Sequence, residues 1–171
     1  SLLNIGEVFR NQGYYELSLS FYRKSLKIFE EIDDNMGTAA SYNNIGLIYE
    51  YQGNYEKALE YHDKSLKTKE KIGDKQGMAA TYTNIGSLYF DKNNYTQALS
   101  LVKKALALAQ EVGAVENIKS ASGLLWDVYK ITGHPAKALQ MHELYIEMRD
   151  SINSIENKEA AIKLQYQHEY E

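Results

Sequence analysis

The stretch SYNNIGLIYEYQGNYEKALEYHDKSL, residues 41–66, repeats a pattern that the chain has already used once. Its tripeptide Asn-Ile-Gly occurs three times, always forty residues apart, at residues 4–6, 44–46 and 84–86. Laying the first forty residues over the next forty gives nineteen identities; the third forty keep the frame and the fourth keep it more loosely. A fixed period of this length indicates stacked supersecondary units, so the period itself predicts a repeat fold.

Each unit has the pattern of two antiparallel helices, and the second unit shows this best. Asp34 can cap a helix whose apolar residues follow the helical 3–4 spacing, namely Tyr42, Ile45, Ile48 and Tyr49. Gly53 is suited to end that helix, and Asn54 can cap the next one. The short connections predict helices packed directly on their neighbours in sequence.

The forty-residue register places helices at about 1–11, 15–31, 35–51, 55–71, 75–91, 95–111, 115–131, 135–151 and 155–171. We expect four repeats at 1–40, 41–80, 81–120 and 121–153, followed by a capping or linker helix over 154–171. Asn153-Ser154 is expected to break the chain between the last two helices, with Ser154 as a cap. The first helix is expected to begin at Ser1, inside the repeat and without a cap, as in a fragment of a longer chain.

The composition excludes several functional classes. Of the 171 residues 44% are hydrophobic, the net charge is −4 and the pI is about 5.6. Without a basic run, binding to nucleic acid is not expected. The chain has no cysteine, which permits either the cytoplasm or an oxidising compartment such as the periplasm. No segment is long and apolar enough to insert into a membrane, and we expect no cofactor.

The spacing that recurs within each unit resembles the tetratricopeptide repeat, in its long forty-residue variety. In the second unit the matching residues are Tyr42, Ile45, Gly46, Tyr49, Gly53, Tyr55, Ala58 and Leu59. The resemblance implies an all-α fold, a right-handed α-solenoid of antiparallel helix pairs that acts as a non-catalytic protein- or peptide-binding module.

The long variety is similar to the repeats of kinesin light chains, of spindle-orientation adaptors, and of sensor modules in bacterial histidine kinases and cyclases. This similarity implies the sensory or scaffolding part of a larger signalling protein. A homo-oligomerising scaffold and a free-standing adaptor are the alternatives.

Residues with catalytic or metal-binding chemistry are few. The four histidines lack metal-ligand spacing; they are His62, His134, His142 and His168. His62 and His142 occupy equivalent positions in their units, which predicts packing beside the core. We therefore expect no catalytic residue and no metal site.

The concave face of a solenoid is lined by the first helix of each unit. Asn4, Asn44 and Asn84 recur there, and each amide can both donate to and accept from the backbone of an extended peptide. The alternative is that these amides bond neighbouring helices across the stack. The expected partner-binding residues are Asn4, Glu7, Asn43, Asn44, Leu47, Glu50, Tyr51, Thr83, Asn84, Ser87, Phe90, Asp127 and Lys130.

Chaperone-binding members of the family grip a terminal carboxylate with several basic residues and two asparagines. The matching positions here hold Leu3, Glu7, Asn44, Ala80 and Asn84. Basic side chains are missing from this set, so a carboxylate clamp is not expected.

Two features of the C-terminal part of the chain leave alternatives open. Trp126 stands where other units have glycine, and it either covers an exposed end of the core or contacts a partner. The terminal helix carries Ile155, Ile162, Tyr166 and Tyr170; it either caps the solenoid or relays a signal to a following domain.

Overall fold

The computed structural model describes the backbone of residues 1–170 and the side chains of residues 1–164. Eight helices make up the regular structure of this part: α1 Leu2–Asn11, α2 Tyr15–Glu31, α3 Asn35–Tyr51, α4 Tyr55–Ile72, α5 Lys75–Asp91, α6 Tyr95–Val112, α7 Val115–Ile131 and α8 Pro135–Tyr170. The all-helical fold confirms the expectation from the repeats. None of the helices described has an apolar stretch of the length that a membrane crossing requires.

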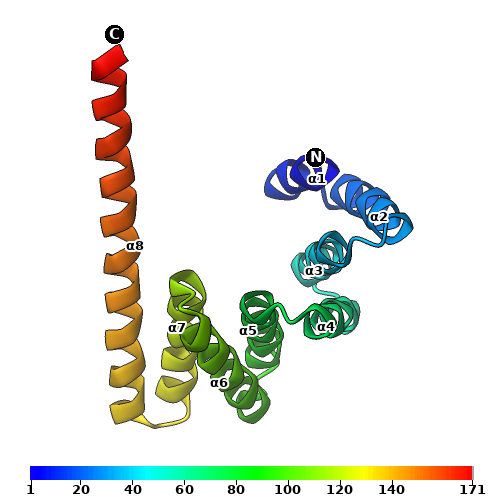
Figure 1. Ribbon diagram of the computed structural model, residues 1–171. Helices are drawn as coiled ribbons and strands as arrows, with labels where there is room; N and C mark the ends of the chain where they lie inside the picture. The colour runs from blue at the N-terminus through cyan, green and yellow to red at the C-terminus, as the bar shows by residue number, and fades with distance from the viewer. Residues whose placement is uncertain (171) are drawn as a thin grey trace.

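The helices are arranged as antiparallel pairs that follow a curved path. Each first helix packs on the second helix of its own unit, and each second helix packs on the first helix of the next unit. Figure 1 shows α1, α3, α5 and α7 on the inner side of the curve, with α2, α4 and α6 outside. The first helices therefore line a concave surface, and α8 closes one end of it.

Polar caps and left-handed residues position the turns. The Asp34 carboxylate accepts a hydrogen bond from the Gly37 amide at 3.0 Å, and Asp74 caps α5 in the same way. Gly53 ends the turn after α3 with a φ of +72°, and the equivalent position after α5 is Asn93 with a φ of +58°. Asparagine is one of the few side chains that tolerate this conformation, so the turn keeps its geometry without glycine.

The N-terminal turn differs from the sequence expectation. The helix α1 begins at Leu2, and the Ser1 hydroxyl caps it by accepting a hydrogen bond from the Asn4 amide at 3.3 Å. The prediction of an uncapped start was wrong, because a serine in this position satisfies one of the free amides of the first turn.

Glycines let the two helices of a unit approach closely. A Cβ atom at Gly6 would lie 2.6 Å from the ring of Tyr22, and one at Gly46 would lie 2.8 Å from the ring of His62. Both of these rings are fully buried. Because the ring from the second helix fills the space over the glycine, the glycine of Asn-Ile-Gly allows the two helices of a unit to pack closely.

The C-terminal helix is continuous where the sequence predicted a break. The helix α8 runs through Asn153 and Ser154 without interruption. These two side chains are exposed, and no glycine or proline follows, so a local capping preference does not end the helix. The prediction of a separate ninth helix capped by Ser154 was wrong.

The distal part of α8 projects beyond the solenoid (Figure 1). Ile155 and Ile162 expose 50% and 54% of their surface, so they do not cover the apolar end of the core. The proximal part packs on α7 through residues such as Leu144, Tyr145 and Met148. The sequence pattern grouped Tyr166 and Tyr170 with Ile155 and Ile162 on the terminal helix, but the side chains of these two tyrosines lie outside the described residues.

Candidate functional site

The concave surface is built from parallel first helices whose side chains meet at a fixed offset. The Asn84 amide nitrogen of α5 donates to the Asn43 amide oxygen of α3 at 3.2 Å. One layer further, the Asn117 side chain of α7 donates to the Gln76 carbonyl of α5 at 3.4 Å. Both pairs are 41 residues apart, so the offset describes how adjacent first helices are aligned.

The three asparagines of the ladder have different surroundings. Asn4 is exposed, and its amide oxygen accepts from the Ser1 hydroxyl at 3.1 Å. Asn84 is half-buried and bonded across the stack, as the alternative interpretation expected, although its partner is Asn43 rather than Asn44. Asn44 is half-buried, and within the described residues its amide makes no hydrogen bond to another side chain.

A small hollow of about 130 Å³ opens between α5 and α7. Its lining is polar and consists of Ala80, Thr83, Asn84, Glu116, Asn117 and Ser120. The Thr83 hydroxyl donates to the Ala79 carbonyl at 3.0 Å, which leaves the amide of Asn84 as the side-chain donor that α5 contributes.

The sequence interpretation named two of these lining residues, Thr83 and Asn84, but missed those from α7. The missed residues follow from helical spacing, because Ser120 and Glu116 precede the predicted Asp127 by seven and eleven residues. Extending that inner face back along the helix would have found both.

Other expected residues of this surface are engaged with their neighbours. Glu7 pairs with Arg10 at 3.1 Å, and Asp127 pairs with Lys130 at 2.9 Å. The Tyr51 ring stacks on Tyr15 with centroids 5.8 Å apart.

The remaining expected residues also lie on the first helices. The Phe90 ring meets Tyr95 edge to face at 5.6 Å. Leu47 and Ser87, like Phe90, are half-buried.

Two carboxylates of this surface are not paired with a basic side chain. Among the described residues, no lysine or arginine forms an ion pair with Glu50 or Asp91; the nearest group to Glu50 is His62, whose Nε2 lies 3.8 Å from its Oε2. Partial burial and then the charge of Glu50 raise the pKa of Asp91. The surface is therefore acidic where α3 and α5 end. The sequence interpretation included Glu50 but missed Asp91.

Trp126 packs on the end of the core, which is one of the two roles that the sequence left open; contact with a partner stays a prediction. Its ring packs on His142 of α8 with centroids 4.0 Å apart and belongs to the core between α7 and α8. The Lys130 ammonium lies over the same ring at 4.1 Å. Trp126 also borders a hollow of about 470 Å³ with Leu139 and His142, so part of it stays accessible.

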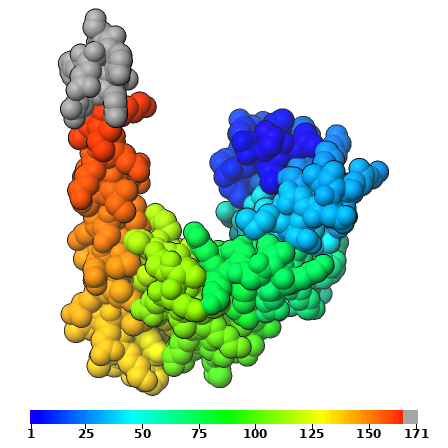
Figure 2. All heavy atoms as spheres, in the orientation of Figure 1, coloured from blue at the N-terminus to red at the C-terminus, as the bar shows by residue number. Residues whose placement is uncertain are grey.

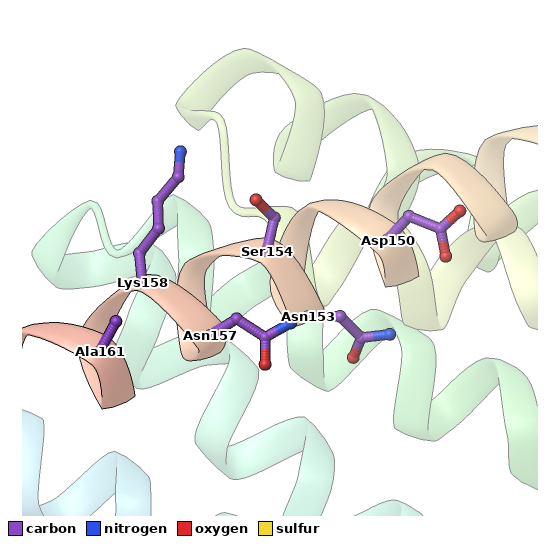
Figure 3. A pocket seen from close by; sticks show the side chains of 6 residues that line it. All are labelled: Asp150, Asn153, Ser154, Asn157, Lys158 and Ala161. Atoms are coloured by element: carbon purple, nitrogen blue, oxygen red, sulfur yellow. The ribbon is translucent and has the colours of Figure 1, made fainter. Parts of the chain in front are cut away.

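A second polar stripe lies on α8. Figure 3 shows its side chains, which are Asp150, Asn153, Ser154, Asn157, Lys158 and Ala161. They are spaced at three, four and seven residues, on the side opposite to the face of Leu144 and Met148 that packs on the core. All six come from one helix, so this stripe is the solvated face of α8.

The family profile described as tetratricopeptide repeat matches residues 1–71 and 77–151. A search of curated proteins finds no significant match.

Several solved structures share the fold. The crystal structure of BtubC (BKLC) from P. vanneervenii has a TM-score of 0.76 and 23% identity over 89% of this chain and 63% of that one. Aspartyl phosphate phosphatase F from Bacillus subtilis has a TM-score of 0.84 and 19% identity over 89% of this chain and 40% of that one.

A Rap protein complexed with competence and sporulation factor has a TM-score of 0.77 and 20% identity, over 86% of this chain and 41% of that one. The present chain thus spans between two fifths and just under two thirds of these proteins.

Proposed function

Because the chain belongs to the tetratricopeptide repeat family, whose helical repeats bind proteins and are generally non-catalytic, we propose that its concave surface binds an extended peptide segment of another protein. In this proposal the chain itself catalyses no reaction. The observation that carries it is the row of amides on α3 and α5, next to the hollow lined by Asn84 and Asn117.

The chemistry of these amides suits a peptide backbone. An asparagine side chain offers two donor hydrogens and one acceptor oxygen, which match the alternating C=O and N–H groups of an extended chain. Asn84 uses one donor for Asn43, and its other groups remain for a ligand. The Asn44 amide forms no hydrogen bond to another side chain of the described residues, so all its donor and acceptor groups can bind a ligand.

The shape of the molecule supports the same proposal. Figure 2 shows an open hollow bounded by the first helix pair on one side and α8 on the other. A concave surface buries more of an extended segment than a flat one does. The similar Rap protein was solved in a complex with competence and sporulation factor, which is consistent with this scaffold receiving a protein or peptide partner.

We further propose that the chain is the sensory or scaffolding part of a larger signalling protein. The support is the projecting helix α8, which packs on α7 with its proximal part and extends beyond the repeats with its distal part. Such a helix can connect the partner-binding surface to whatever follows it, provided that binding favours one of its arrangements over another.

Peptide selection tests the binding proposal. A phage-displayed library of random dodecapeptides is selected against the protein, and hydrogen exchange maps where the enriched peptides bind. We expect protection on the inner helices α3, α5 and α7, with α2, α4 and α6 unchanged. Protection confined to the outer helices, or the absence of any enriched peptide, would contradict a concave peptide site.

Self-association is a second candidate function, favoured by the exposed apolar residues of distal α8. Ile155, Ile162 and Leu164 each expose half or more of their surface. Light scattering tests this candidate. A concentration-dependent dimer that Ile155→Lys and Ile162→Lys abolish would support it, and a monomer at all concentrations would reject it.

A further inference from the structure

The carboxylates Glu50 and Asp91 occupy positions where helices usually prefer cations. Glu50 lies in the last turn of α3, and Asp91 is the last residue of α5. The carbonyl groups at a helix C-terminus carry partial negative charge, which disfavours an anion and favours a cation. The positions equivalent to Glu50 in the first and fourth units follow this preference, with Arg10 and Lys130.

The offset between α3 and α5 brings the two carboxylates to the same part of the surface. The Asn43–Asn84 hydrogen bond joins residues 41 apart on these parallel helices. Glu50 and Asp91 are also 41 apart, each seven residues further along its helix, which is about two turns. The charge of Glu50 acts on Asp91 strongly enough to raise its pKa, with burial as the larger cause.

A buried histidine is directed at the same place. His62 of α4 is fully buried, and neither of its ring nitrogens has a hydrogen-bond partner. Its ring passes against Gly46, which has no side chain to block it, and Nε2 lies 3.8 Å from Oε2 of Glu50. That oxygen is also buried and without a partner. The two ring nitrogens of His62 and Oε2 of Glu50 therefore lie together beneath the surface, and none of them forms a hydrogen bond.

Buried polar atoms without partners are rare in folded proteins and call for an explanation. The other carboxylates of the concave surface already have cationic partners, as in Glu116 with Lys119 at 2.9 Å. Only the pair at the C-terminal ends of α3 and α5 lacks one, among the described residues of this surface.

We propose that Glu50 and Asp91, backed by His62, form a subsite for the cationic side chain of an arginine or lysine in the bound peptide. This inference rests on the proposed peptide-binding function and specifies one residue of the partner. A guanidinium or ammonium group can lie between the two carboxylates and interact with both, and it is favoured by the carbonyl ends of two helices. Arginine fits best, because its fork of donors can engage two carboxylates together.

The surroundings of the subsite suit a basic side chain with an aliphatic stem. Tyr51, next to Glu50 in sequence, exposes 58% of its surface, and Phe90 directly precedes Asp91. Aromatic rings bind the stem by apolar contact and the cationic group through their π-electrons. A metal ion is less suited, since the described residues include no cluster of three or more candidate ligands.

The same random dodecapeptide library tests this inference separately from the proposed function. We expect the enriched peptides to share one arginine or lysine at a fixed position. The double variant Glu50→Gln/Asp91→Asn should bind them at least about tenfold more weakly. Replacing the shared basic residue of the peptide by methionine should weaken its binding to the wild type by a similar factor. The same replacement should hardly weaken binding to the double variant any further, because the two changes remove one interaction.

A matched control removes the same two charges elsewhere. Glu143→Gln/Glu147→Gln lies on the exposed side of α8 and should bind the basic peptides as the wild type does. Peptides that bind the concave helices without a shared basic residue would overturn the subsite and leave the proposed function standing. Equal weakening by both double variants would also overturn it, since the effect would then be one of net charge.

A small probe covers the case in which no peptide is enriched. N-acetyl-arginine methylamide is titrated into the protein while the imidazole signals of the histidines are followed by NMR. Saturable shifts of His62 that disappear in Glu50→Gln/Asp91→Asn would support the cation subsite even if the groove takes no extended peptide. Shifts that are absent, or that persist in the double variant, would overturn it.

Discussion

The backbone of Gly46 lies directly against the imidazole of His62, so close that a Cβ atom would be 2.8 Å from Cε1 of the ring. The ring is fully buried and belongs to the neighbouring helix of the same unit. A larger residue at this position must displace the ring or separate α3 from α4.

Gly46→Leu should therefore lower the free energy of unfolding by roughly 1–3 kcal/mol or more, because overpacked cores accommodate added volume poorly. Gly86→Leu should behave similarly, since its added side chain would meet Val102. Chemical denaturation of both variants measures the effect. Gly123→Ala is a milder control, because its Cβ would lie 3.3 Å from the Tyr145 ring. If both leucine variants are as stable as the wild type, the helices do not approach each other closely at these glycines.

Asn44 and Asn84 should separate binding from stability. Asn84→Ala removes the hydrogen bond to Asn43, which should cost about 0.5–1.5 kcal/mol of folding stability. Asn44→Ala breaks no side-chain bond of this kind and should leave the melting temperature nearly unchanged.

Both asparagine variants should weaken binding of a selected peptide by about 1–3 kcal/mol, if the amides are buried against its backbone. Fluorescence anisotropy with the labelled peptide gives the affinities, and thermal melts give the stabilities. Normal binding by the double variant together with early unfolding would show that the asparagines serve only the fold.

Asp91→Asn should stabilise the unliganded protein at neutral pH. Folded Asp91 has a raised pKa, so it holds its proton to a higher pH than the unfolded chain, whose value is near 3.8. Between these two values the folded state binds more protons, and stability falls as the pH rises through this window. Asparagine does not ionise, so the variant should be more stable at pH 7 by roughly a few tenths of a kcal/mol, given the exposure of this side chain.

The difference between Asp91→Asn and the wild type should shrink as the pH falls and level off well below pH 3.8, where both the folded and the unfolded Asp91 are protonated. Urea denaturation at several pH values measures it. Asp63→Asn is the control, because Asp63 pairs with Lys67 at 2.6 Å on the outer helix α4 and should not stabilise on neutralisation. A stability difference that is independent of pH would argue against ionisation as the cause.

Lys69 should make the protein more stable as the pH becomes alkaline. Its side chain is buried, its Nζ donates to the Thr81 hydroxyl at 2.8 Å, and burial lowers its pKa below 10.5. The folded protein thus loses this proton at a lower pH than the unfolded chain does. Between the two values the unfolded state binds more protons, so this contribution to stability grows with pH and is complete above 10.5.

The comparison of wild type with Lys69→Met isolates the lysine from the tyrosines, which titrate in both proteins. The stability of the wild type relative to the variant should increase between pH 7 and pH 10, as measured by denaturation with urea. A constant difference would mean that Lys69 titrates as it does in the unfolded chain.

The forty-residue period was sufficient to predict most of the fold. It placed α3 at residues 35–51, as observed, and α4 within one residue of its end at Ile72. These boundaries depend on local features, such as the Asp34 cap and the left-handed Gly53, which the sequence displays directly. The prediction of a break at Ser154 failed because no such local feature ends the helix there. A capping residue does not end a helix unless tertiary structure or a helix breaker redirects the chain.

The candidate site was predicted only in part. Asn43, Glu50 and Asn84 were correctly placed on first helices, but their partners depend on how two units are aligned in space. The offset of 41 between α3 and α5 differs by one residue from the period of forty, so the repeat alone does not give it. Asp91 could not be matched with Glu50, nor could His62 be directed at it, without this alignment.

The distal part of α8 should be the least protected helical segment of the described chain. Residues 153–164 are exposed along their whole length, so few tertiary contacts shield their backbone hydrogen bonds. Local opening is easiest where few apolar contacts must be broken. Hydrogen exchange of these amides should be faster than in α5 and α6, and truncation after Ile152 should change the free energy of unfolding by less than about 1 kcal/mol.

This same segment distinguishes an inert extension from a relay. If it relays a signal, a bound peptide must favour one arrangement of α8 over another, because binding that is equal in both arrangements moves nothing. Exchange in residues 153–164 should then change when the selected peptide binds, although these residues lie outside the row of amides on α3 and α5. Glu50→Gln/Asp91→Asn, which weakens peptide binding, should reduce this change in hydrogen exchange in proportion to the fraction of protein that is bound. Exchange that stays the same at full occupancy would rule out the relay.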